Sequence, residues 1–307
     1  YLAEKEKSGL PDAGACSMAD PEAVPCRASG DSLSDALHTR CFIKVQDGCD
    51  QFCSYCIIPY ARGRICSRPV SEIIAEIKDY TQDGYKEFVP TGIHISSYGK
   101  DRPEDGEDLL TLIQRMSETE GVKRIRLSSL EPRIITEDFA RSLSEIEQLC
   151  PHFHLSLQSG SDAVLKRMNR HYTTDEFMES VDILRSYFNA PAITTDIITG
   201  FPGETEEEFA QTREFLERVG FYEMHIFKYS RREGTAADRM PGQLTDAEKS
   251  ARSDVLFELE REQSRAFRSD YIGKWALVLW EDEREINRQT YMIGHTADYV
   301  KIALPVW

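Results

Sequence analysis

The stretch Lys44-Val45-Gln46-Asp47-Gly48-Cys49-Asp50-Gln51-Phe52-Cys53-Ser54-Tyr55-Cys56 contains three cysteines with the spacing C-x3-C-x2-C. Cysteine thiolates are ligands for zinc or for iron and sulfur. An iron-sulfur cubane that only carries electrons takes four protein ligands, so three ligands in one loop leave one corner open for chemistry. Tyr55 precedes the last cysteine, where its ring can shield a cluster and stack on a purine.

Two simpler explanations of this loop stay open, a zinc site and uncoordinated thiols. A structural zinc site normally combines two C-x2-C pairs, or cysteines with histidines, and no second pair follows Cys56 in the sequence. Three thiols within eight positions cannot all pair with one another as disulfides. The spacing therefore favours an iron-sulfur site over either alternative.

The residues around the loop resemble the radical S-adenosylmethionine (SAM) methylthiotransferases. The resemblance runs from about Cys41 to near Lys301. It rests on ordered motifs, which are Ile58-Pro59-Tyr60-Ala61-Arg62-Gly63-Arg64, Thr91-Gly92-Ile93-His94, Leu157-Gln158-Ser159-Gly160-Ser161, Gly200-Phe201-Pro202-Gly203-Glu204-Thr205 and Tyr229-Ser230-Arg231-Arg232-Glu233-Gly234-Thr235. The first motif is most similar to the branch that modifies threonylcarbamoyladenosine in tRNA.

The resemblance implies a transferase whose [4Fe-4S] cluster is bound by Cys49, Cys53 and Cys56 and chelates SAM at its open iron. An electron donor such as flavodoxin or ferredoxin would reduce the cluster, and the resulting 5′-deoxyadenosyl radical would activate C2 of the modified adenine next to the tRNA anticodon. A methylthio group is then installed. Isopentenyladenosine in tRNA or an aspartate of a ribosomal protein remain alternative targets, and a metal-cysteine RNA-binding fragment without turnover is an alternative of another class.

Composition indicates a soluble, cytoplasmic protein. The chain has 307 residues and is 40% hydrophobic, enough for one large core and a small second unit. We expect no membrane span and no secretory signal, because no apolar run approaches 18 residues and the N-terminus lacks a basic region followed by an apolar stretch. A net charge of -16 is opposite to the basic footprint of most nucleic-acid binders. Contact with tRNA must therefore be local, and the candidate RNA-binding residues are Arg62, Arg64 and Arg232.

Short β-rich runs alternate with amphipathic segments from Cys41 onward, which predicts an α/β fold with a parallel sheet, a partial (βα)6 barrel. The expected strands are 41–46, 86–91, 123–128, 152–157, 192–198 and 223–228. Capping boxes predict helices after Thr173 and Thr205. A long helix is expected over about 245–269.

Parallel barrels place their chemistry at the carboxyl ends of strands, and the remaining candidate residues follow the predicted strands there. As cofactor-binding residues we expect Tyr55, Gly92, Ser129, Glu131, Gln158, Ser159 and Asp196. Each has a structural explanation as well, since Gly92 can simply make a turn and Glu131 can cap the helix that starts near Thr136.

Three units are expected: residues 1–40 as a linker or remnant of an N-terminal domain, 41–269 as the radical SAM core, and 270–307 as part of a small β-barrel like the RNA-binding TRAM domain of this family. The alternating segments 271–280 and 292–302 suggest the barrel strands. The family also carries an N-terminal domain with a second, auxiliary cluster, and Cys16, Cys26 and Cys41 do not match its cysteine spacing. Pro90 and Cys66 depart from the family pattern, and Pro90 is unexpected inside a strand.

Overall fold

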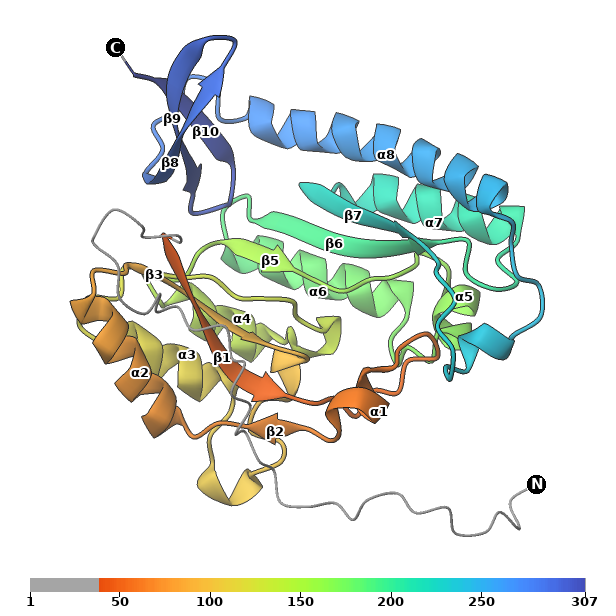
Figure 1. Cartoon of the computed structure of the whole chain (residues 1–307), viewed down its shortest axis with the longest axis horizontal. Helices are drawn as coiled ribbons and strands as arrows, with labels where there is room; N and C mark the ends of the chain where they lie inside the picture. Colours follow the sequence, from red (N-terminus) through yellow and green to blue (C-terminus); the bar gives the residue numbers. More distant parts are fainter. Residues whose placement is uncertain (1–38, 307) are drawn as a thin grey trace.

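The computed structural model describes residues 39–306, and its centre is an open, curved sheet of parallel strands (Figure 1). The strands are β1 (Arg40–Asp47), β3 (Glu87–Gly92), β4 (Arg124–Ile125), β5 (His152–His154), β6 (Ala192–Thr199) and β7 (Glu223–Lys228). Ladders join β1, β3 and β4, and also β5, β6 and β7, while the single bridges Ile125–Leu149 and Leu130–Leu155 connect the two groups. The predicted partial (βα)6 barrel is confirmed.

Helices cover the outer face of this half-barrel (Figure 1). They are α2 (Val70–Gln82), α3 (Leu109–Ser117), α4 (Glu137–Ser144), α6 (Thr174–Tyr187) and α7 (Glu206–Val219). Strand side chains alternate between the two faces, and the set that meets the helices is fully buried, with Ile43, Phe88, Phe153 and Ile197 at 0% exposure. The opposite set lines the concave face and includes polar and charged residues.

Local signals in the sequence placed the helix starts correctly. The structure forms both predicted capping boxes, Thr173 with Glu176 at α6 and Thr205 with Glu208 at α7. A third, Thr245 with Glu248, begins α8 (Asp246–Ser269), which matches the long helix predicted there. Shorter elements are α1 (Ile58–Arg62), α5 (Asp162–Arg167), a two-residue strand β2 (Cys66–Ser67) antiparallel to β1, and the 3-10 turns Ile95–Ser97, Pro103–Asp105, Pro132–Ile134 and Ala237–Arg239.

A three-stranded antiparallel sheet follows α8 and lies near the start of β1, at the amino ends of the barrel strands (Figure 1). Its strands are β8 (Val278–Ile286), β9 (Gln289–Thr296) and β10 (Lys301–Pro305). Arg124 and Arg126 of the barrel donate hydrogen bonds to backbone carbonyls of this sheet and its turns, and the ring of Tyr299 lies 4.7 Å from the Arg126 guanidinium carbon. The C-terminal sheet thus closes the barrel at the amino ends of its strands.

Buried charges stabilise this closure. Glu87 is fully buried and accepts hydrogen bonds from Arg40 and Arg126, each at 2.8 Å, while Arg124 lies 3.6 Å away. Burial acts to raise the pKa of Glu87, but Arg126, Arg40 and Arg124 outweigh it and lower the pKa. The carboxylate is therefore charged and paired.

Part of the C-terminal prediction is wrong. A strand was expected over 271–280, but β8 begins only at Val278, because residues 271–273 form a turn in which Gly273 has φ +77°. Trp275 and Leu277 are almost fully exposed among the described residues, so the alternating pattern there has no sheet face to pack on.

Pro90 lies within β3, as the sequence suggested, without disrupting it. It pairs in register with Ile43 of β1. The backbone N–H of Arg126, just after β4, donates to the carbonyl of Phe88. Pro90 is two residues further along β3, so its nitrogen faces the same side, and β4 has already ended there at Ile125. A proline is tolerated because no ladder bond is required from it.

The unexpected cysteines take different positions. Cys41 is fully buried in the core and Cys66 is buried in β2, while Cys16 and Cys26 fall outside the described residues, as does most of the proposed linker 1–40. Across residues 39–306, no helix combines the length and the apolar character needed to cross a membrane.

Candidate active site

The loop with the three cysteines connects β1 to α1 at the carboxyl end of the barrel, and hydrogen bonds hold it from two sides. The backbone N–H of Cys49 donates to the carbonyl of Gly63 at 3.1 Å. From the α5 side, the Ser54 N–H donates to the Met168 carbonyl at 2.9 Å and the Ser54 hydroxyl donates to the Arg167 carbonyl at 2.8 Å. Hydrogen bonds to the Gly63 turn and to the end of α5 therefore position the loop.

All three cysteines of the loop are free thiols, Cys49 buried and Cys53 and Cys56 partly exposed. Burial raises the pKa of the Cys49 thiol, and the neighbouring thiols add to the effect. Burial also raises the pKa of Cys56, partly opposed by Arg232 and Arg170. Three sulfur donors in one anchored loop fit an iron-sulfur cluster, whose binding displaces the thiol protons.

Tyr55 turns its ring into an apolar cluster beneath the loop. The ring packs edge to face on Phe201, with centroids 6.4 Å apart and planes at 81°, among Val164, Met168 and Tyr229. Burial first, and then the nearby Cys53, raise the pKa of Tyr55 well above its usual value. The phenol therefore stays neutral and supports the loop from below.

Gly92 ends β3 where the backbone of β1 approaches closely. A Cβ at this position would lie 2.8 Å from the backbone oxygen of Gln46 and 2.8 Å from its side-chain oxygen. The Gln46 side chain is fully buried, accepts from the N–H of His94 at 2.8 Å and donates to the carbonyl of Gly48 at 2.8 Å. Glycine is thus required by the packing that joins the Thr91–His94 motif to the cysteine loop.

Glu131 is a buried carboxylate at the strand-end edge after β4. It accepts from Arg133 at 2.5 Å, and the Nε2 atom of His94 lies 3.5 Å away. Burial acts to raise the pKa of Glu131, but His94 and Arg133 outweigh it and lower the pKa to about 2. The alternative that Glu131 caps the following helix is wrong, because the side chain of Thr136 caps α4.

The other strand-end candidates differ in exposure. Gln158 is buried, has φ +71° and bridges to β6, with its N–H donating to the Asp196 carbonyl at 2.9 Å. Ser159 is fully buried and its hydroxyl lies 3.3 Å from that of Thr212 in α7, so it faces the helix layer. Ser129 is exposed. Left-handed backbone at a non-glycine residue such as Gln158 is typical of functional sites.

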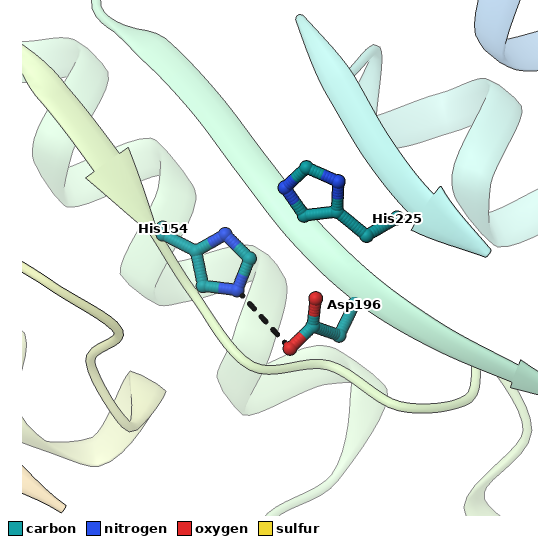
Figure 2. Close-up of side chains that lie close together, drawn as sticks. All are labelled: His154, Asp196 and His225. Atoms are coloured by element: carbon teal, nitrogen blue, oxygen red, sulfur yellow. Dashed lines mark ion pairs between the residues drawn. The ribbon is translucent and has the colours of Figure 1, made fainter. Parts of the chain in front are cut away.

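Asp196 lies on the concave face next to two histidines that the sequence did not assign to any site. His154 of β5 places Nε2 3.3 Å from Oδ2 of Asp196, and His225 of β7 is directly opposite Asp196 in the ladder. Figure 2 shows the three side chains on the same side of the sheet. The signal available in the sequence was only their position in three successive predicted strands.

The three predicted RNA-binding arginines are exposed around the cysteine loop. Nε of Arg62 lies 3.4 Å from Asp47, Nη1 of Arg64 lies 3.3 Å from Asp50, and the Arg64 guanidinium is 5.6 Å from the ring centre of Phe52. Arg232 follows β7 and is close enough to affect the Cys56 thiol. The structure thus groups residues that are 170 positions apart in sequence.

Arg170 is not among the site residues predicted from the sequence, where it stands out only as part of a basic cluster with Lys166, Arg167 and His171. Its Nη1 donates to the sulfur of Cys53 at 3.3 Å, its Nε donates to the Tyr172 hydroxyl at 2.9 Å, and its guanidinium lies 4.8 Å from the ring centre of Tyr172. Burial acts to lower the pKa of Arg170, but Tyr172, Tyr55 and Cys53 raise it. A permanent cation beside the Cys53 sulfur stabilises negative charge on that sulfur.

Comparison with known proteins agrees with this arrangement. The sequence matches the family described as the radical SAM superfamily over residues 43–216. The chain belongs to the radical SAM superfamily. Solved structures of similar fold include the radical SAM methyltransferase TsrM from Kitasatospora setae (TM-score 0.54, 16% identity, 64% of this chain and 38% of that chain). Methylornithine synthase PylB is another (TM-score 0.51, 16% identity, 73% of this chain and 62% of that chain).

Curated relatives with higher identity are tRNA-modifying enzymes. One is the threonylcarbamoyladenosine tRNA methylthiotransferase MtaB of Thermotoga maritima, 45% identical over 79% of this chain and 56% of the relative. Another is the tRNA-2-methylthio-N(6)-dimethylallyladenosine synthase of Thermoanaerobacter sp. (strain X514), 42% identical over 82% of this chain and 54% of the relative. The chain spans about half the length of the curated relatives it matches.

Proposed function

We propose that this chain is the radical SAM part of a tRNA methylthiotransferase that modifies C2 of N6-threonylcarbamoyladenosine near the anticodon. The observation that carries the proposal is the anchored loop with three free cysteines at the carboxyl end of the half-barrel, with Arg170 donating to the sulfur of Cys53. Relatives that carry out this reaction support the choice of substrate.

In this proposal Cys49, Cys53 and Cys56 bind a [4Fe-4S] cluster, and the strand-end residues Gly92, Ser129, Glu131 and Gln158 bind SAM. When bound, the cluster and SAM supply reductive cleavage and the radical that activates the substrate carbon. The chain itself binds, orients and excludes water. Arg170 offsets negative charge at Cys53, and Glu131 offers a charged acceptor to an ammonium or ribose hydroxyl. The Tyr55 ring excludes water from the space beneath the loop.

The proposal extends to partners. Arg62, Arg64 and Arg232 contact tRNA phosphates or bases, since the planar guanidinium suits both, and the C-terminal sheet belongs to a TRAM-like RNA-binding unit. A flavodoxin or ferredoxin acts as electron donor in the cytoplasm, and the complete family has a second cluster. Dimethylallyladenosine is the second candidate substrate, supported by relatives of similar identity.

Product analysis tests the proposed substrate. The anaerobically reconstituted chain is incubated with SAM, a reductant and tRNA that carries either threonylcarbamoyladenosine or dimethylallyladenosine. The same incubations are repeated with the chain fused to the N-terminal domain of a relative. We expect 5′-deoxyadenosine from the chain alone, and a methylthio product on threonylcarbamoyladenosine only when the fused domain supplies sulfur. Methylthiolation of dimethylallyladenosine alone would reverse the choice of substrate, and absence of SAM cleavage would refute the enzyme.

A further inference from the structure

The cluster of His154, Asp196 and His225 lies on the concave face of the half-barrel (Figure 2). Asp196 is opposite His225 in the β6–β7 ladder, and His154 is opposite Thr194, two positions before Asp196 on the same face. Neighbouring residues of the opposite strand parity, Ile193, Ile197 and Ile226, belong to the buried core. The three polar side chains therefore share one wall of the barrel interior.

Exposure increases across this wall. His154 is 9% exposed, the Asp196 side chain is 30% exposed, and His225 is exposed on the edge strand β7. Thr194 lies 3.0 Å from Nδ1 of His154, which fixes the ring. Nε2 of His154 is buried and makes no hydrogen bond, although Oδ2 of Asp196 is 3.3 Å away. The rings of His154 and His225 stack with centroids 5.6 Å apart, so Asp196 and His225 are the two more accessible members of the cluster.

Backbone hydrogen bonds join this wall to Gln158 at the carboxyl end of the barrel. The N–H of Gln158 donates to the Asp196 carbonyl and the N–H of Ile198 donates to the Gln158 carbonyl, both at 2.9 Å. Phe227, two positions after His225 on the same face of β7, is 53% exposed and offers a ring on which a base can stack. The exposed ring of Phe227 therefore follows the His225 imidazole along the same wall.

We propose that Asp196 and His225 bind the polar substituent on N6 of the target adenine, and thereby select a carboxylate-bearing group over a hydrocarbon one. The inference rests on the proposed function and names which part of the substrate this wall recognises. A threonylcarbamoyl group carries N–H and O–H donors and a carboxylate. The Asp196 carboxylate accepts from such a donor, and His225 donates to the substrate carboxylate or carbonyl.

The dimethylallyl group has no polar atom, so its binding would leave Asp196 and His225 desolvated without partners. Sites built to hydrogen-bond a substrate discriminate strongly against an analogue that lacks the matching group, because buried polar atoms remain unpaired. The described part of the chain thus offers a physical basis for choosing between the two substrates of its relatives.

The test uses the anaerobically reconstituted chain with SAM and two nucleoside probes, N6-threonylcarbamoyladenosine and N6-dimethylallyladenosine, in equilibrium dialysis. A bond to a charged partner contributes enough for a change of about 10-fold to 100-fold in affinity. We expect His225→Ala and Asp196→Ala each to weaken threonylcarbamoyladenosine by that factor, with dimethylallyladenosine unchanged. Asp182→Ala, at an exposed carboxylate on the outer helix α6, serves as the control and should behave as wild type.

The proposal would be overturned if the variants lost affinity for both probes equally or for neither. It would also be overturned if wild type bound dimethylallyladenosine or plain adenosine more tightly than threonylcarbamoyladenosine. The three side chains also bring ligand atoms within 4.8 Å of one another, so divalent metal is measured by mass spectrometry. One equivalent held by wild type and lost in Asp196→Ala would assign the wall to a cation instead. Iron content and SAM cleavage on the same samples report separately whether the proposed function holds.

Discussion

Replacing Glu131 with Gln tests whether the strand-end edge is held in a charged state. The carboxylate is buried, accepts from Arg133 at 2.5 Å and lies 3.5 Å from Nε2 of His94. Glutamine keeps the shape and one acceptor oxygen but removes the charge. The Arg133 guanidinium then loses its counter-charge and His94 loses a carboxylate neighbour, so we expect a less stable fold and weaker SAM binding.

The magnitude follows from linkage. Burial raises and His94 and Arg133 lower the pKa of Glu131, with a net fall from 4.5 to about 2. At 1.36 kcal/mol for each pKa unit, this corresponds to about 3 kcal/mol at neutral pH as an upper limit, and solvent screening reduces the expectation to about 2 kcal/mol. Because the folded-state pKa is depressed, the contribution is present above about pH 4.5 and is lost as the pH falls toward 2.

Urea denaturation of wild type and Glu131→Gln at pH 7.5 and pH 3.5 measures this difference. The free energy of unfolding of the variant should be lower at pH 7.5, and the gap should narrow at pH 3.5, because the carboxyl of the unfolded wild type is then mostly protonated while the folded one is still charged. Arg133→Gln, at a half-exposed partner, is the control and should cost less. A variant within about 0.5 kcal/mol of wild type at pH 7.5 would refute the reasoning, since surface changes also fall in that range.

Three further predictions concern RNA binding and packing. The double variant Arg62→Glu, Arg64→Glu should weaken tRNA binding in a filter assay, with a shallow dependence on salt, and leave SAM cleavage without RNA intact. The control double variant Arg115→Glu, Arg141→Glu, at exposed positions of α3 and α4, should bind tRNA like wild type. Equal tRNA affinity of the two double variants would show that Arg62 and Arg64 do not bind tRNA. Gly92→Ala should lower stability by about 1–3 kcal/mol because its Cβ meets the Gln46 backbone oxygen; an unchanged urea midpoint would show that β1 yields. Glu87→Ala should lower stability by about 3–5 kcal/mol by leaving buried arginines unpaired; a loss below 1 kcal/mol would contradict the closure described for the C-terminal sheet.

Alternation and capping were sufficient to predict the sheet and most helices. Strand β6 consists mostly of β-branched residues, and Thr205 with Glu208 marks the next helix start, so local signals agree with the fold. The segment 271–277 misled because its alternation resembles a strand although Gly273 turns the chain. Periodicity alone does not reveal whether a partner surface is present.

The cysteine loop could be predicted because its three ligands are adjacent in sequence. Arg170 could not, because its contact with the sulfur of Cys53 depends on α5 meeting the loop across 117 residues. Likewise, His154 and His225 carry no local signal, and only the register of β5, β6 and β7 brings them to Asp196. Sites assembled by tertiary packing remain beyond what spacing predicts.

The most direct test of the central claim is the iron and SAM chemistry of wild type and Cys53→Ala after anaerobic reconstitution. Wild type should hold about four irons per cluster site, show iron-sulfur absorbance and release 5′-deoxyadenosine from SAM on reduction. Cys53→Ala should lose both, whereas Cys150→Ala, at a buried free cysteine outside the loop, should keep both. A Cys53→Ala protein that retains the cluster and SAM cleavage would contradict the assignment of this loop.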